Sequence, residues 1–67
     1  MAKGRGGYHV EDPDYRRVTR ISAPLDRAAA EQRAMSESRR TPGVWRVVPE
    51  GDSKPVARFE DGKQVRG

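Results

Sequence analysis

The sequence predicts a small α+β domain in which a strand, a helix and a β-hairpin follow a flexible N-terminal arm. Three observations predict this fold class. The chain has 67 residues, which allows one domain close to the lower size limit for independent folding. A helix-forming segment at residues 22–40 has recognisable start and stop signals. Residues 44–48 are the most apolar stretch and are rich in strand-favouring residues.

The first 14 residues are expected to form the flexible arm, and residues 15–67 the single domain. Three glycines among the first seven residues make this segment costly to order in backbone entropy. Residues 11–14, Glu-Asp-Pro-Asp, form an acidic cluster that is typical of turns. His9, the one histidine of the chain, is therefore expected to be a solvated residue of the arm.

Residues 15–22 are predicted to form an edge strand, because they include Tyr, Val, Thr and Ile. The alternation of side chains along a strand would place Tyr15, Thr19 and Ile21 on one face. Arginines pointing outward from this segment would discourage unwanted pairing with other chains, as charged residues do at natural sheet edges.

The helix is the most clearly signalled element. Ser22 is the expected N-cap, and Pro24 fits the first turn, where a missing N–H costs no hydrogen bond. Arg39 and Arg40 suit the negative end of the helix dipole. Pro42 disfavours helical geometry at the residue before it, so the helix should end there.

Side-chain spacing predicts two ion pairs on the helix surface and one thin buried face. Arg27 with Glu31, and Arg33 with Glu37, stand four residues apart. Each such pair contributes about 0.2–0.5 kcal/mol. The 3.6-residue period predicts a buried stripe of mostly small side chains. The stripe consists of Leu25, Ala28, Ala29, Gln32 and Met35.

The strand at residues 44–48 is followed by a loop and then by one of two structures. In the first, residues 55–60 are the return strand of a hairpin, and a tight Asp-Gly turn leads into a short last strand. In the second, a short helix runs from the cap Ser53 to Gly62. The hairpin is favoured, because it lets the apolar residues Val56, Phe59 and Val65 meet Trp45 and Val47.

Trp45 has two possible roles. Tryptophan is common in binding hot spots, yet it is also the largest filler for a core with few other large apolar residues. The core is the favoured interpretation for Trp45 and for Phe59. Arg46 points the opposite way along the strand, so the two faces of the sheet have different tasks.

The composition argues against an enzyme. The single histidine lies in the arm and there is no cysteine, so neither a histidine–nucleophile pair nor a thiolate metal site is expected. A chain of this size and apolar content cannot easily enclose a substrate pocket. We therefore expect no catalytic residue, metal, cofactor or small-molecule substrate. The absence of a long apolar run or secretory signal predicts a cytoplasmic protein without a membrane span.

The charge balance favours an anionic partner. Lys and Arg number 14 against 10 Asp and Glu, giving a net charge of +4. Eleven of the cations are arginines, a skew that GC-rich codons can also produce. We predict an accessory or regulatory protein that binds nucleic acid through arginines. The candidate phosphate-binding residues are Arg5, Arg16, Arg17, Arg20, Arg39 and Arg40.

The alternative function is a protein-binding module, such as an inhibitor of a host enzyme or a small virion component. Its candidate contact residues are Trp45, Arg46 and Arg58 on the hairpin. Small cores are commonly supplemented by a partner, so association with a second copy of the chain is also possible.

The stretch from residue 28 to residue 63 resembles small accessory proteins encoded by bacteriophages of actinobacteria. In those proteins a helix ends in a Pro-Gly-x-Trp turn that leads into a strand, as at residues 42–45 here. A Gly-Lys pair follows a small apolar segment, as at residues 62–63. The resemblance implies a phage origin, which agrees with the GC-rich composition, and it transfers no functional residue.

Overall fold

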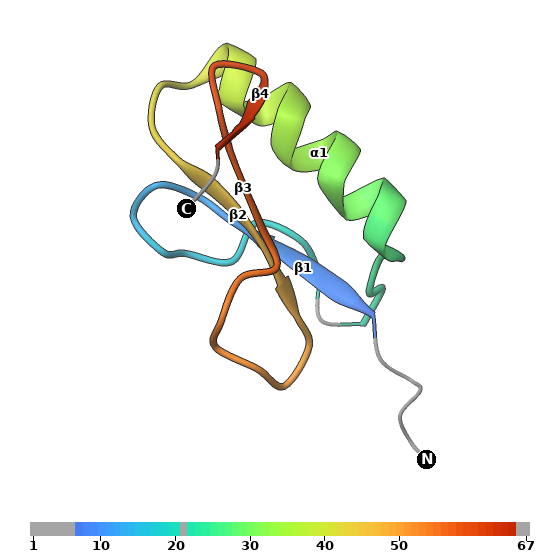
Figure 1. Ribbon diagram of the computed structural model, residues 1–67. Coiled ribbons are helices and arrows are strands. Elements are labelled where there is room, and N and C mark those ends of the chain that lie inside the picture. The colour runs from blue at the N-terminus through green and yellow to red at the C-terminus, as the bar shows by residue number, and fades with distance from the viewer. Residues whose placement is uncertain (1–6, 21, 66–67) are drawn as a thin grey trace.

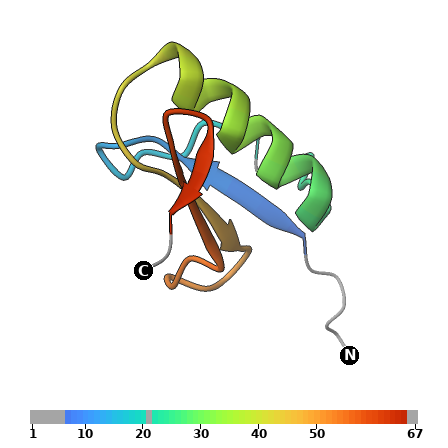
Figure 2. The same ribbon diagram turned by 45° about the horizontal axis from the view of Figure 1, so that its top comes forward.

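The computed structural model describes residues 7–20 and 22–65. These residues form one antiparallel sheet with a helix on one of its faces (Figure 1). The elements are β1 (Tyr8–Glu11), α1 (Arg27–Arg40), β2 (Trp45–Pro49), β3 (Ala57–Glu60) and β4 (Lys63–Val65). The strands lie in the sheet in chain order, and each pairs antiparallel with the next. Figure 2 shows α1 lying across the strands. The predicted α+β class and the strand–helix–hairpin order are confirmed.

The core lies between α1 and the sheet. Trp45 pairs with Phe59 across β2 and β3, and Val47 lies between Val10 and Ala57. All five side chains are buried and belong to one apolar cluster with two alanines of α1. The prediction of Trp45 and Phe59 as core residues is therefore confirmed. No helix in the described part of the chain has the length and apolar character needed to cross a membrane.

The first strand is not where the sequence predicted it. β1 lies inside the expected arm, so the ordered domain begins well before residue 15, and residues 1–6 of the arm lie outside the described residues. The described residues between 15 and 22 form no strand, and Arg17 makes one isolated bridge to Glu11. The chain turns at Asp12, whose carbonyl accepts a hydrogen bond from Tyr15 N at 2.8 Å. That turn includes Tyr15, the residue expected to begin the strand.

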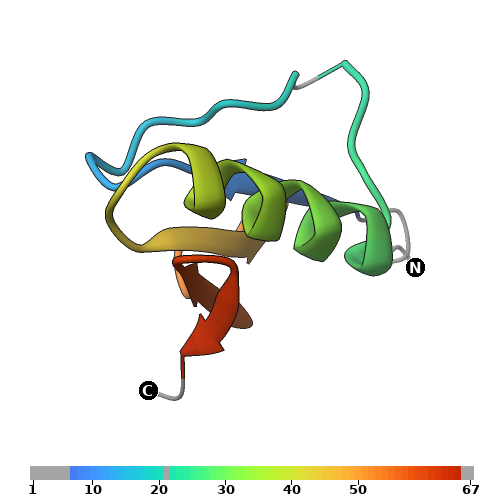
Figure 3. The same cartoon turned by 90° about the horizontal axis from the view of Figure 1, so that it is seen from above.

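The segment after β1 nevertheless covers the outer edge of that strand (Figure 3). Tyr8 and Leu25 exchange two backbone hydrogen bonds, at 2.7 and 3.1 Å, and Val18 N donates to Val10 O at 2.9 Å. These bonds satisfy the backbone groups that an edge strand would otherwise expose. Residues 12–20 and 22–25, here called the covering segment, thereby close one side of the sheet.

The helix begins later than predicted and buries a different face. Asp26 is the N-cap in place of Ser22, and its side chain accepts a hydrogen bond from Ala29 N at 2.8 Å. The delay arises because Leu25 is still extended and bridged to Tyr8. The buried face is Ala30, Ala34 and Ser38. Of the predicted stripe, Leu25 and Met35 pack only at the margin of the core, and Ala28, Ala29 and Gln32 are exposed.

The end of the helix and the hairpin follow the prediction. Thr41 is the C-cap, and both surface ion pairs, Arg27–Glu31 and Arg33–Glu37, form at 2.9 Å. The alternative short helix after Ser53 is wrong, since β3 and β4 form the predicted hairpin. Its turn residues Asp61 and Gly62 both have positive φ, of 56° and 78°, as the tightest hairpin turns require.

Two details of the predicted hairpin packing are wrong. Val56 is exposed, and Val65 pairs with Arg58 on the face away from α1, so neither side chain joins Trp45 in the core. Side chains alternate along the return strand, so Ala57 and Phe59 face the helix, whereas Val56 precedes the strand and would fall on the same face as Arg58.

Candidate functional site

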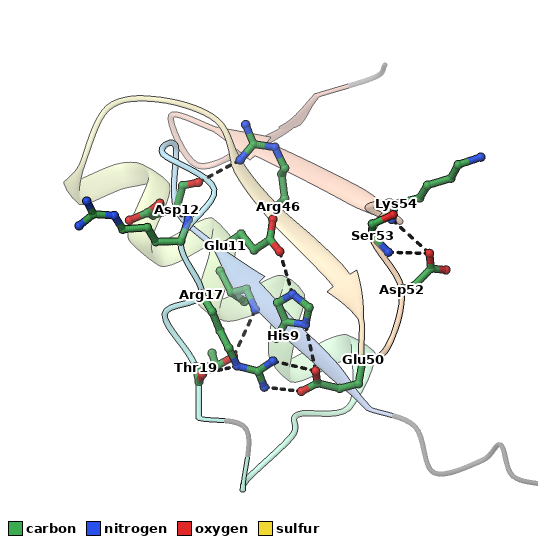
Figure 4. A network of polar contacts seen from close by, with 12 residues as sticks. His9, Glu11, Asp12, Arg17, Thr19, Arg46, Glu50, Asp52, Ser53 and Lys54 are labelled. Atoms are coloured by element: carbon green, nitrogen blue, oxygen red, sulfur yellow. Dashed lines mark hydrogen bonds and ion pairs between the residues drawn. The ribbon is translucent and has the colours of Figure 1, made fainter.

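The sheet face opposite α1, here called the outer face, carries most of the strand charges. The pairing register puts Glu11, Arg46, Arg58 and Val65 in one row across the four strands. The side chains assigned to this face by the register are His9, Glu11, Arg46, Val48, Arg58, Glu60, Lys63 and Val65. The covering segment and the loop after β2 contribute further groups to it (Figure 4).

His9, Glu11, Arg17 and Glu50 form an ion-pair network on this face, here called the anchoring cluster (Figure 4). His9 is buried, with 6% exposure, so the expectation that it is a solvated residue of the arm is wrong. Its Nδ1 lies 3.1 Å from Glu50 Oε1, and its Nε2 lies 2.9 Å from Glu11 Oε2. A neutral imidazole donates to one of these carboxylates, whereas the imidazolium donates to both.

Arg17 is the centre of the anchoring cluster. Its guanidinium donates to both carboxylate oxygens of Glu50, with Nη1 at 2.8 Å from Oε1. Nε and Nη2 also donate to the carbonyls of Thr19 and Arg20, at 2.7 and 3.1 Å. The bonds from Arg17, with its charge and that of His9, lower the pKa of Glu50 below its usual value despite partial burial. Arg17 is thus a structural residue that fastens the covering segment to the loop after β2.

Arg46 and Tyr15 form a second feature of the outer face. Arg46 is 9% exposed, and its Nη1 donates to Asp12 O at 2.9 Å. Its guanidinium carbon lies 3.6 Å from the centroid of the Tyr15 ring, which is a cation–π contact. Within residues 7–20 and 22–65, Arg46 has no ion pair with a carboxylate. A buried guanidinium therefore relies on one carbonyl and one aromatic face.

Tyr15 is held in an unusual backbone conformation at the tip of the covering segment. Its φ is 67°, in the left-handed region that few residues other than glycine, asparagine and aspartate adopt. Asp12 maintains this conformation, because its side chain accepts hydrogen bonds from Asp14 N and Arg16 N at 2.9 and 2.8 Å. The ring is 69% exposed. Strained residues of this kind concentrate at functional sites.

Gly43 fixes the position of the same loop tip beside β2. Its φ is 118°, and a Cβ at this position would collide with the Pro13 ring. The Pro-Gly pair that ends the helix signal therefore has a second role, since it lets residues 12–15 approach the start of β2 closely.

The predicted arginines do not form one surface. Arg16 and Arg20 are exposed on the covering segment, whereas Arg17 is engaged by Glu50 and is not available to a phosphate. Arg39 and Arg40 are exposed on the last turn of α1, on the helix layer of the domain. Arg5 lies outside the described residues. The exposed members of the predicted set thus divide between two elements, the covering segment and the last turn of α1.

The three residues predicted to contact a protein partner have different environments. Trp45 is 5% exposed and its Nε1 donates to Thr41 O at 3.1 Å, so it is a core residue and its assignment to a contact surface is wrong. Arg46 points to the opposite face, as predicted, but is covered by Tyr15. Arg58 is half-buried beside Arg46 on the outer face.

Two open pockets flank the helix. The larger, about 350 Å³, lies between the end of α1 and the β3–β4 turn and is lined by Arg39, Arg40, Glu60 and Asp61 among others. The smaller, about 290 Å³, lies between α1 and the covering segment, near Arg20 and Arg33. In the described part of the chain, no group of three His, Cys, Asp or Glu side chains is placed to hold a metal ion.

Sequence reasoning missed Tyr15 as a site residue and did not foresee that Tyr15 covers Arg46. The turn-forming Asp12-Pro13-Asp14 sequence was a usable signal, because it ends β1 and presents the next residue at a loop tip. The contact between Tyr15 and Arg46 depends on the path of the whole covering segment. Comparison of this chain with protein-family models, curated proteins and solved structures finds no match. Its function is therefore inferred from the geometry of its own residues.

Proposed function

We propose that this chain is a non-enzymatic accessory protein that binds nucleic acid on the outer face of its sheet. The observation that carries the proposal is the exposed ring of Tyr15, stacked on the buried guanidinium of Arg46 and held in a strained conformation. Aromatic rings with adjacent cations are typical of nucleic-acid-binding surfaces, where the ring meets a base and the cations meet phosphates.

Further cations belong to the outer face or to the loop that carries Tyr15. Arg58 is the cross-strand neighbour of Arg46, and Arg16 follows Tyr15 directly in the chain. Lys63 is exposed two strands away from Arg46 on the same face. None of these three forms an ion pair with any residue that the structure describes. Arg16 and Arg58 are therefore the better placed of the three to meet an anionic ligand, because Glu60 lies across the hairpin from Lys63.

The carboxylates of the outer face have neighbours of their own among the basic residues. Glu11 shares the row with Arg46, but its Oε2 is occupied by His9 at 2.9 Å. Glu50 is engaged by Arg17. Glu60 is the cross-strand partner of Lys63 at the end of the hairpin. Around the exposed Tyr15 ring, Arg46, Arg58 and Arg16 therefore form no ion pair with a carboxylate of the described residues.

The alternative of a protein-binding module has less support. It was centred on Trp45, which is buried between the sheet and α1. An exposed tyrosine with arginines nearby supplies both a ring for a base and cations for phosphates, a combination that nucleic-acid-binding surfaces use. A nucleic-acid ligand would be met in the cytoplasm, which is the location we propose.

A salt titration with two charge variants tests this proposal. Oligonucleotide binding is measured at about 50 and 200 mM salt, and three phosphate contacts predict a loss of affinity of about 20- to 40-fold between them. Substituting Arg16, Arg58 and Lys63 by glutamine should weaken binding and flatten the salt dependence. The matched control substitutes Arg27, Arg33 and Arg40 on α1, which removes the same charge from the other layer.

The result that overturns the proposal is either no binding by the original chain at about 50 mM salt or equal weakening in both variants. Equal weakening would mean that net charge, and not the outer face, carries the interaction. Circular dichroism of both variants verifies that they retain the fold.

A further inference from the structure

Tyr15 has the one large aromatic surface that the described part of the chain presents to solvent. Its inner ring face covers the guanidinium of Arg46, yet 69% of the residue remains exposed. The outer ring face and the ring edge therefore point to solvent. Trp45 and Phe59 are buried, and Tyr8 packs against the core. A ligand that needs an aromatic platform has one place to bind.

The platform is ordered before any ligand arrives. Asp12 holds the loop tip with its carbonyl and its side chain, and the same carbonyl accepts the hydrogen bond from Arg46. Tyr15 and the cation beneath it thus share one anchor. Little ordering entropy remains to be lost on binding, which favours affinity for a small contact.

The shape of the platform favours an unpaired base over a duplex. Bases in a duplex are stacked on their neighbours, so a single ring at a loop tip cannot reach a base face without unstacking it. A single strand offers its base faces at no such cost, and base–aromatic stacking is the usual mode of recognition. Arg46 adds a positive charge behind the ring, and this charge attracts the anionic strand to the platform.

The cations around the platform match the backbone of such a strand. Arg58 on β3 is the cross-strand neighbour of Arg46, and Arg16 on the covering segment directly follows Tyr15 in the chain. Two cations close to one stacked base suit the phosphates on either side of it. A duplex would need a longer row of cations, and those on α1 belong to the other layer.

We infer that the outer face binds single-stranded nucleic acid, with one base stacked on Tyr15 and the adjacent phosphates on Arg16 and Arg58. This inference rests on the proposed function and narrows its ligand class. DNA and RNA strands share the recognised chemistry, so both are probes in the test.

The test compares a short single strand containing 2-aminopurine with its duplex, in DNA and in RNA. Stacking on an aromatic ring quenches this fluorescent base. The variant is Tyr15→Asn, because asparagine adopts positive φ readily and keeps the loop conformation without the ring. Tyr15→Phe, which keeps the ring, is the matched control. Thermal unfolding verifies that both variants fold.

The single strand should bind more tightly than the duplex and be quenched on binding. Tyr15→Asn should weaken single-strand binding about 5- to 150-fold and abolish the quenching, whereas Tyr15→Phe should preserve both. Whether the DNA or the RNA oligonucleotide binds more tightly identifies the kind of nucleic acid that the chain prefers.

Two failures are distinguishable. If neither strand nor duplex binds, the proposed function itself is wrong. If both bind equally, or if Tyr15→Asn binds like the original chain, nucleic-acid binding stands and the stacked base is wrong.

Discussion

Glu50 holds the segment that carries Tyr15 against the sheet. Its carboxylate accepts hydrogen bonds from Arg17, which belongs to the covering segment, and contacts His9 on β1. The same interactions lower the pKa of Glu50. One residue in the loop after β2 thereby links three parts of the chain that are distant in sequence.

Replacing Glu50 by glutamine should destabilise the protein by about 1–3 kcal/mol at neutral pH, because Arg17 and His9 lose a charged acceptor in a partly buried site. Denaturant unfolding measures this change. Glu31→Gln, which removes an exposed ion pair on α1, is the control and should cost only about 0.2–0.5 kcal/mol. Equal effects from the two substitutions would show that the anchoring cluster contributes no more than a surface pair.

Acid should reduce the difference between the original chain and Glu50→Gln. The pKa of Glu50 is lower in the folded state than its usual value of 4.5, so the folded protein binds this proton less readily than the unfolded chain does. The stabilisation is complete above about pH 4.5 and is lost as the pH falls through the folded-state pKa. Unfolding free energies of both proteins between pH 7 and pH 2 should therefore converge. A constant difference would contradict the role of the Glu50 carboxylate.

At the scale of the elements, α1 lies on the sheet through small side chains. Ala30, Ala34 and Ser38 are buried at four-residue spacing, which matches one helix face. Ser38 also fastens the end of the helix to the hairpin, because its Oγ accepts a hydrogen bond from Gly62 N at 2.8 Å. These small side chains let the helix lie close to the sheet, so the helix contributes no large apolar side chain to its buried face.

A larger side chain on the buried face of α1 should push the helix away from the sheet. Ala34→Leu inserts three carbons where Ala34 has no exposure, and overpacking of this kind costs about 1–3 kcal/mol. Ala28→Leu, at an exposed position of the same helix, should be nearly neutral because leucine is almost as good a helix former. Denaturation midpoints compare the two. A stable Ala34→Leu variant would mean that the helix does not pack closely on the sheet.

For the whole molecule, local signals predicted the elements that depend on local chemistry. The end of α1 follows from Thr41, Pro42 and Gly43, and the β3–β4 turn follows from Asp61 and Gly62. At both sites a particular residue type satisfies the backbone conformation that the turn or the helix end requires, so the residues adjacent in sequence are enough to predict it. The identification of Trp45 as core also followed from its neighbours, since few other residues could fill that volume.

The predictions that were wrong concern features that depend on contacts between residues distant in sequence. β1 was missed because its four residues lie between glycines and an acidic turn, and only pairing with β2 makes them a strand. The helix start moved because Leu25 is bridged to Tyr8. Arg16 and Arg17 are adjacent and chemically identical, yet only Arg17 meets Glu50. No local pattern distinguishes them, so the site could be predicted as arginine-rich but not residue by residue.

The most direct test of nucleic-acid binding on the outer face is a nuclear magnetic resonance titration of the isotope-labelled chain with a short single-stranded oligonucleotide. We predict the largest amide shifts at Tyr15 and Arg16 on the covering segment and at Arg46 and Arg58 on the strands. Shifts concentrated on the exposed residues of α1, with the outer face unchanged, would contradict it.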